Sequence, residues 1–126
     1  MCLHKIKYSG IDYKTCWKVF NKKDDGLHSI TFYNEISYSE DKEYLSDDYG
    51  FCAFTNKKDA ETFRKTLLDN DVCIERWDLK DLVIKKVKCD EIIKWGEQIV
   101  GYNFHYITKP SIAFKKMTII SELKGR

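Results

Sequence analysis

Residues 50–68 read GFCAFTNKKDAETFRKTLL, and this stretch predicts a strand that leads directly into a helix. The apolar and aromatic segment 50–55 is typical of a short buried strand. Asn56 is a good helix N-cap, and Asp59 in the first turn favours the positive end of the helix. The apolar positions of the predicted helix 56–69 recur at helical spacing and form one stripe: Ala60, Phe63, Leu67 and Leu68.

The residues before this stretch predict a β-hairpin over 15–32. Residues 15–20 are β-branched and aromatic, Asp25-Gly26 is a turn dipeptide, and 27–32 form the return strand. His28 shares the apolar face of that return strand. We interpret it as a half-buried histidine, with proton transfer as the functional alternative.

The residues after it predict further strands over 72–79, 81–88, 104–108 and 111–120. A short second helix is expected over 90–96, and a break at Lys109-Pro110. The predicted class is α+β, with an antiparallel or mixed sheet of about six strands and the main helix 56–69 on one face. A chain of 126 residues with 1 Pro and 6 Gly suits a single domain, 1–126.

Composition excludes several classes of protein. No apolar run reaches the roughly 18 residues of a membrane helix, and the start MCLHKIKYSG is too short for a signal peptide, so we expect a soluble cytoplasmic protein with no membrane contact. The five cysteines include no CxxC pair and are expected to be small buried residues. Cys2 and His4 are too few for a zinc site, and no glycine-rich phosphate loop is present, so no metal and no cofactor are predicted.

Residues 33–49, YNEISYSEDKEYLSDDY, are here named the acidic tyrosine loop. A solvated surface loop would explain the acids. Tyrosine, however, is amphipathic and enriched in contact surfaces, so acids among tyrosines predict a surface for a basic protein partner. The candidate partner-binding residues are Tyr38, Glu40, Asp41, Glu43, Tyr44, Asp47, Asp48 and Tyr49.

Residues 80–126 hold 10 basic and 5 acidic residues, a balance of +5, against +2 for the whole chain. Rings for stacking and lysines for phosphates are the composition that binds nucleotides or single strands. This alternative surface contains Trp95, Tyr102, His105, Tyr106, Lys109, Lys115 and Lys116.

The pattern Gly50-Phe-x-x-Phe54-Thr55, followed by Ala60 in a helix and a strand from Val72, resembles the middle of ADP-ribosyltransferase-like domains. The resemblance implies that fold, NAD as substrate and Glu97 as the catalytic acid. The first strand of that family carries a His or Arg, where this chain has Cys16-Trp17-Lys18.

These observations favour a small non-enzymatic binding or regulatory protein that acts through a protein partner. The abundance of Lys, Asn, Ile and Tyr is typical of AT-rich genomes and suggests an inhibitor from a phage or mobile element. The alternatives are a nucleotide or single-stranded nucleic-acid binding module, and a divergent ADP-ribosyltransferase-like enzyme.

Overall fold

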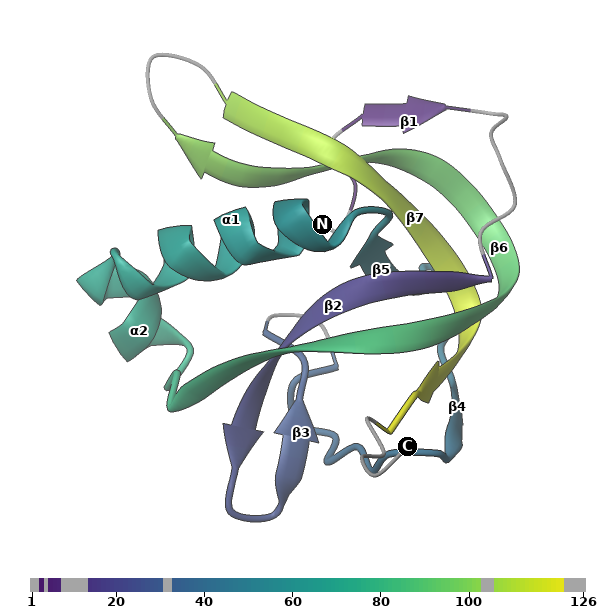
Figure 1. The fold of residues 1–126 in the computed structure, drawn as a ribbon, viewed down its shortest axis with the longest axis horizontal. Coiled ribbons are helices and arrows are strands. Elements are labelled where there is room, and N and C mark those ends of the chain that lie inside the picture. The colour runs from purple at the N-terminus through teal and green to yellow at the C-terminus, as the bar shows by residue number, and fades with distance from the viewer. Residues whose placement is uncertain (1–2, 4, 8–13, 31–32, 103–105, 122–126) are drawn as a thin grey trace.

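A computed structural model describes residues 3, 5–7, 14–30, 33–102 and 106–121 of the chain. In these residues seven strands form one antiparallel sheet, and two consecutive helices lie between the fifth and sixth strands (Figure 1). The α+β class expected from the sequence is therefore confirmed. In chain order the elements are β1 (Lys5–Lys7), β2 (Thr15–Lys23), β3 (Gly26–His28), β4 (Glu43–Leu45), β5 (Phe51–Phe54), α1 (Lys57–Leu68), α2 (Asp71–Arg76), β6 (Asp81–Tyr102) and β7 (Tyr106–Ile119).

The strand pairings close into a ring. The first part of β6, residues 81–88, pairs with β2, and residues 87–102 pair with β7. β7 pairs in turn with all four residues of β5. The ring closes where β5 meets β2, through the single pair Trp17↔Phe54. Within the described residues this junction, here named the β2–β5 seam, is the least paired part of the ring.

The two long strands β6 and β7 curve strongly around the other elements (Figure 1). Their register shifts between Ile92 and Lys94 and again between Ile99 and Gly101. Such bulges bend a strand and increase its twist, which lets one pair of strands reach both β2 and β5. The short strands β1 and β4 lie at the outer ends of the sheet, β1 against β6 and β4 against β7.

The predicted hairpin is present as β2 and β3, with residues 24–25 at the turn and Gly26 at a φ of +139°. A positive φ at this position favours glycine. The return strand is shorter than predicted, because β3 ends at His28; residues 31–32 lie outside the described residues.

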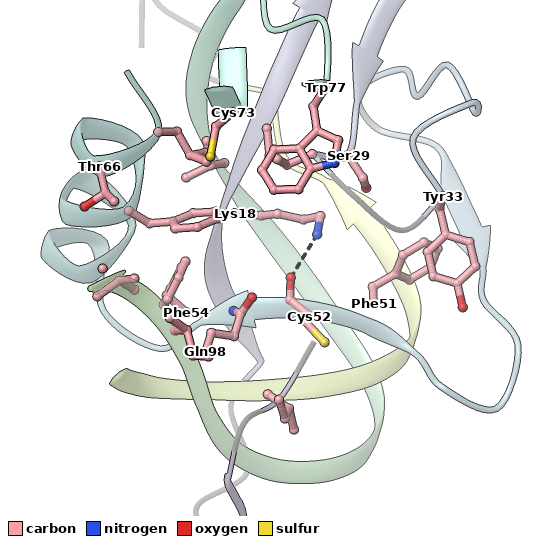
Figure 2. Close-up of a pocket in the computed structure, with 18 of the residues that line it drawn as sticks. Lys18, Ser29, Tyr33, Phe51, Cys52, Phe54, Thr66, Cys73, Trp77 and Gln98 are labelled. Carbon is pink, nitrogen blue, oxygen red and sulfur yellow. Dashed lines mark hydrogen bonds between the residues drawn. The ribbon is translucent and has the colours of Figure 1, made fainter. Parts of the chain in front are cut away.

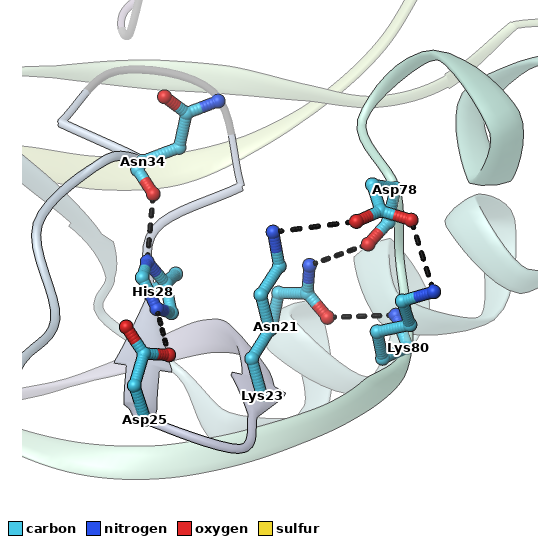
Figure 3. Close-up of polar contacts among 7 residues, drawn as sticks. All are labelled: Asn21, Lys23, Asp25, His28, Asn34, Asp78 and Lys80. Carbon is cyan, nitrogen blue, oxygen red and sulfur yellow. Dashed lines mark hydrogen bonds and ion pairs between the residues drawn. The ribbon is translucent and has the colours of Figure 1, made fainter.

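Two buried polar side chains tie this hairpin to its neighbours (Figure 3). Asn21 is 2% exposed; its Nδ2 donates to the Asp78 carbonyl at 3.1 Å, and its Oδ1 accepts from the Lys80 amide at 2.8 Å. These hydrogen bonds fix the turn that precedes β6. Asp78 lies in this turn and has a φ of +50°.

His28 is the second of these side chains. One ring nitrogen, Nδ1, lies 2.7 Å from the Asn34 carbonyl, and Nε2 lies 2.8 Å from the Asp25 carboxylate (Figure 3). Both partners are acceptors, so the imidazole satisfies both contacts only when both nitrogens carry a proton. His28 is buried, as a structural histidine is expected to be.

The predicted helix 56–69 is confirmed as α1. The Asn56 side chain accepts a hydrogen bond from the Lys58 amide at 2.9 Å and caps the first turn. Ala60 and Leu67 are buried against β2 and β6. Leu68 was expected on the same stripe, but it is 50% exposed, because one residue beyond the buried Leu67 the side chain is rotated by about 100° around the helix axis.

The predicted strand 72–79 is wrong, because this segment begins with helix α2. Asn70, which follows the predicted helix 56–69, caps the start of α2: its Oδ1 accepts from the amides of Val72 and Cys73 at 3.0 and 3.1 Å. The Asn70 side chain satisfies two free amides at the start of α2, and this N-cap favours a helix over the strand predicted for residues 72–79. Glu75, within α2, is exposed.

The predicted second helix 90–96 is also wrong, because these residues belong to β6. Ile92 and Trp95 prefer strands, and pairing with β7 satisfies the backbone along this stretch. The predicted break at Lys109-Pro110 is absent, since β7 runs through it and the Pro110 carbonyl accepts from Thr55. Residues 104 and 105 of the predicted strand 104–108 lie outside the described residues.

The apolar core consists mainly of two clusters. The first takes Phe20, Phe51, Val87 and Phe114 from the four strands of the ring, together with Tyr38. The second lies between the sheet and α1 and includes Val19, Phe54, Leu67, Leu82 and Val100. Both strands of the β2–β5 seam contribute to both clusters, Val19 and Phe54 to the second and Phe20 and Phe51 to the first.

Candidate ligand-binding cavity

A cavity of about 500 Å³ lies beside the β2–β5 seam, between β2, β5, β6 and the two helices (Figure 2). Most of its wall is apolar or aromatic and includes Val19, Phe51, Phe54, Phe63, Leu67 and Trp77. Cavities of this size, lined by apolar side chains with a few polar groups, are typical of small-molecule sites. The geometry therefore suits a ligand with one or two rings.

The local structure explains why the cavity forms at this place. β2 and β5 share one pair, so the strands separate beyond Trp17 and Phe54. The apolar stripe of α1 contributes Phe63, whose ring lies 5.6 Å from that of Phe54. The end of α2 contributes Trp77 on another side. Each wall thus comes from a different element.

Lys18 brings a positive charge into this apolar cavity. Its side chain crosses from β2 toward β5, and the Nζ donates to the Cys52 carbonyl at 2.9 Å (Figure 2). The Nζ also lies 5.8 Å from the centre of the Phe20 ring. In the part of the chain that the structure describes, Lys18 has no carboxylate at ion-pair distance.

Lys85, the residue opposite Lys18 in the β2–β6 ladder, differs from Lys18 in having a carboxylate partner. Lys85 on β6 is in register with Lys18, and directly opposite residues project from the same face of a sheet. The Lys85 ammonium lies 3.1 Å from the Glu40 carboxylate. One lysine of this like-charged pair is therefore neutralised by an acid, and the other faces the cavity.

Hydroxyl and amide groups add polar contacts to the wall. Ser29 lines the cavity, is 3% exposed, and its Oγ has no hydrogen-bond partner among the described residues. The Tyr38 hydroxyl is likewise buried and lies beside that of Ser29. Burial raises the pKa of Tyr38 to about 12, although the contact with the Ser29 hydroxyl opposes the shift. Gln98 donates to Ser111 Oγ at 3.0 Å.

The four cysteines that the structure describes fit the interpretation as small, mostly buried residues. Cys16, Cys52 and Cys89 are buried, and Cys73 is half-buried in the cavity wall. A hydrogen bond with the Cys16 thiol, together with burial, raises the pKa of Cys89 well above its usual range. Cys89 is therefore a protonated thiol in the core at neutral pH.

The acidic tyrosine loop is an ordered segment that contains β4. Tyr38 lies in the core, and the half-buried Tyr44 packs against it edge-on at 4.7 Å. Asp47 accepts hydrogen bonds from the Tyr33 hydroxyl and the Tyr49 amide, and the first of these contributes most to lowering its pKa. Asp41 accepts from the Ser121 amide at 3.2 Å.

Other candidates of this loop are on the surface. Glu43 is exposed on β4, next to Leu45, which is 65% exposed. Tyr49 is 77% exposed, and the Asp48 side chain is fully exposed at 3.8 Å from Lys115. Glu40, the remaining candidate, pairs with Lys85.

The basic candidates of the last third do not form one compact patch in the described residues. Lys115 pairs with Asp48, and Lys116 pairs with Glu91 at 2.8 Å. Lys109 lies six residues before Lys115 on β7, a separation of roughly 20 Å along a strand. Trp95 is half-buried against the first core cluster. Tyr102 and Tyr106 are register partners at the end of the β6–β7 ladder, and His105 lies outside the described residues.

The strand-to-helix junction that resembles ADP-ribosyltransferase-like domains is present as β5 and α1. The strand expected to follow from Val72 is replaced by α2. Glu97, the acid that the resemblance implies, lies on β6 and accepts a hydrogen bond from the Thr108 hydroxyl. It is not among the residues that line the cavity.

Sequence reasoning did not single out the cavity residues. The available signal was Lys18, a charged residue between Trp17 and Val19 in an otherwise apolar strand. Ser29 and Trp77 carried no signal, because their proximity depends on how β3 and α2 pack around the seam.

The fold and the site together define a small α+β domain with a ligand-sized cavity at the weakest junction of its sheet. No protein family model, curated protein or solved structure matches this chain. Neither α1 nor α2 nor any other helical stretch of the described residues could span a membrane. Within the same residues, no three His, Cys, Asp or Glu side chains are grouped as metal ligands would be.

Proposed function

We propose that this chain is a non-enzymatic binding protein that holds a small, largely apolar molecule in the cavity. The observation that carries the proposal is the cavity of about 500 Å³ with aromatic walls from strands and helices. Phe54, Phe63 and Trp77 offer rings against which a flat ligand can pack.

The affinity expected for a simple probe follows from its size. Drug-sized ligands gain about 0.3 kcal/mol per non-hydrogen atom. A probe of about 18 such atoms therefore gains roughly 5.5 kcal/mol, which corresponds to a dissociation constant of about 0.1 mM. A natural ligand with matched polar contacts binds more tightly.

The test is titration with the neutral fluorescent probe N-phenyl-1-naphthylamine. We expect saturable binding by the wild-type chain and at least tenfold weaker binding by Thr66→Trp, which fills the cavity from α1. The matched control is Thr62→Trp, one turn earlier on the exposed face of α1, which should bind as wild type does. Equal binding by both variants, or no saturable binding by wild type, would contradict the proposal.

A second function is favoured by exposed residues at the end of the edge strand β4 and just after it: Leu45, Asp48 and Tyr49. An exposed leucine and tyrosine next to acids suit a protein partner with a basic surface. In the described residues β4 pairs with β7 alone, and a partner could add a strand along its other edge. Through such a contact the chain would act as a small regulator or inhibitor.

The test of the second function is a pull-down at low salt with the double variant Asp48→Lys/Tyr49→Ser. We expect loss of a basic partner that the wild-type chain retains, and unchanged capture by the control Glu61→Lys on the exposed face of α1. Asp47 is left unchanged because its hydrogen bonds order the loop. Undiminished capture by the double variant would show that Asp48 and Tyr49 do not bind the partner.

A further inference from the structure

We propose that the ligand of the cavity carries a negative charge, that Lys18 binds this charge, and that the ligand class is an aromatic carboxylate. This inference rests on the proposed binding function of the cavity and specifies its ligand. Three features of the site support it: the charge of the wall, the hydrogen-bonding capacity of Lys18, and the aromatic side chains of the wall.

Among the described residues, the wall of the cavity carries a single charge. Lys18 is the one basic residue of that part of the wall, and no Asp or Glu belongs to it. The nearest lysine in the ladder, Lys85, has Glu40 as its counter-ion. An ammonium group in apolar surroundings without a counter-ion favours an anionic ligand, because the charge is costly to bury alone.

The ammonium group has donors to offer. A lysine has three N–H donors, and the Cys52 carbonyl accepts one of them. A carboxylate oxygen can accept another while the bond to Cys52 is kept. A hydrogen bond between two charged groups is roughly twice as strong as a neutral one.

The aromatic side chains of the wall match a ring on the ligand. Phe54, Phe63 and Trp77 line the cavity, and the rings of Phe54 and Phe63 lie 5.6 Å apart. A carboxylate attached to a ring that packs among these side chains would meet the ammonium group of the same wall.

Lys18 also has a structural role, because its bond to Cys52 bridges the β2–β5 seam. The two roles are separated by comparing two ligands of equal shape, 1-naphthaleneacetate and its neutral analogue 1-naphthaleneacetamide. Loss of stability in a variant weakens binding of both ligands, whereas loss of the charge contact weakens only the acetate.

The experiment measures displacement of N-phenyl-1-naphthylamine by each ligand at neutral pH and low salt. For the wild-type chain we expect the acetate to bind about tenfold more tightly than the acetamide. Lys18→Met should bring this ratio to about one, and Lys18→Arg should keep most of it. The control Lys86→Met, whose lysine lies over the Trp17 ring and does not line the cavity, should leave the ratio unchanged.

Equal affinities in the wild-type chain would overturn the inference while the binding function stands. A preference for the acetate that persists in Lys18→Met would overturn the role of Lys18. Absence of binding by the probe and by both ligands would overturn the proposed function together with the inference.

Discussion

The Lys18 ammonium on β2 donates a hydrogen bond to the Cys52 carbonyl on β5 at 2.9 Å. The two strands share one ladder pair, so a side chain takes the place of the next backbone bond between them. At this point the Lys18 ammonium, and not a run of backbone hydrogen bonds, connects β2 to β5. Because the same ammonium faces the cavity, a change at Lys18 is expected to alter both the stability of the fold and the binding of a ligand.

Lys18→Met is expected to lower the free energy of unfolding by about 1–2 kcal/mol, because the Cys52 carbonyl loses a charged donor. Lys18→Arg should lose less, since a guanidinium can still donate. Urea denaturation measures both. The control is Lys22→Met, an exposed lysine of the same strand, and an equal loss in that variant would contradict the assigned bond.

Asn21→Ala should destabilise the chain by about 1–3 kcal/mol, because it leaves the Asp78 carbonyl and the Lys80 amide without their partner. Asn34→Ala is the matched control: its backbone carbonyl contacts His28, and this contact survives the substitution. Thermal unfolding followed by circular dichroism distinguishes the two. A melting temperature for Asn21→Ala equal to that of wild type would show that the two hydrogen bonds of the Asn21 side chain do not stabilise the fold.

Gly50→Ala is expected to cost about 1–3 kcal/mol. Gly50 has a φ of +84°, and an added Cβ would lie 3.0 Å from both the Ile93 Cδ1 and the Phe114 carbonyl oxygen. In Gly101→Ala the nearest atom would be Thr66 Oγ1 at 3.6 Å, an ordinary contact. We therefore expect a change within about 0.5 kcal/mol for that control. Similar losses for both glycines in chemical denaturation would contradict the backbone assigned at Gly50.

The Asp25–His28 pair predicts a dependence of stability on pH. The hydrogen bond from His28 lowers the pKa of Asp25 below its ordinary value of 3.8. A carboxyl group with a lowered pKa stabilises the fold above the pKa of the unfolded chain, and this contribution is lost as pH falls through the folded pKa. The difference in unfolding free energy between wild type and Asp25→Asn should therefore be present at pH 5 and shrink below about pH 4.

The measurement for this pair is a series of urea denaturations between pH 5.5 and pH 3 for wild type and Asp25→Asn. Asp24→Asn is the control, because Asp24 lies in the same turn but accepts no hydrogen bond from His28. A difference for Asp25→Asn that stays constant down to pH 3 would argue against the pairing.

The elements with strong local signals could be predicted from the sequence. The Asn56 cap and the apolar spacing of Ala60, Phe63 and Leu67 predicted α1, and Asp25-Gly26 predicted the hairpin turn. Asn70 was an equally local signal for an N-cap, but the residues after it were predicted as a strand and begin with α2. Residues 90–96 became a strand through pairing with β7, which no local pattern reveals.

The candidate site was harder to predict than the fold. The acids and tyrosines of residues 33–49 predicted a single contact surface, but burial divides them: Tyr38 is in the core, whereas Asp48 and Tyr49 are exposed. The sequence shows that a side chain is amphipathic, and packing decides which part of it reaches the solvent.

By itself the sequence determined the class of fold, the strand-to-helix junction at 50–68 and the hairpin turn, because each depends on residues that are close along the chain. Only the tertiary structure decided the closed ring of strands, the cavity and the contact between Lys18 and Cys52. These two residues are 34 positions apart, and their contact exists because β2 and β5 separate after one pair. Where the two strands are apart, the Lys18 side chain makes the hydrogen bond between them that a paired backbone would otherwise make.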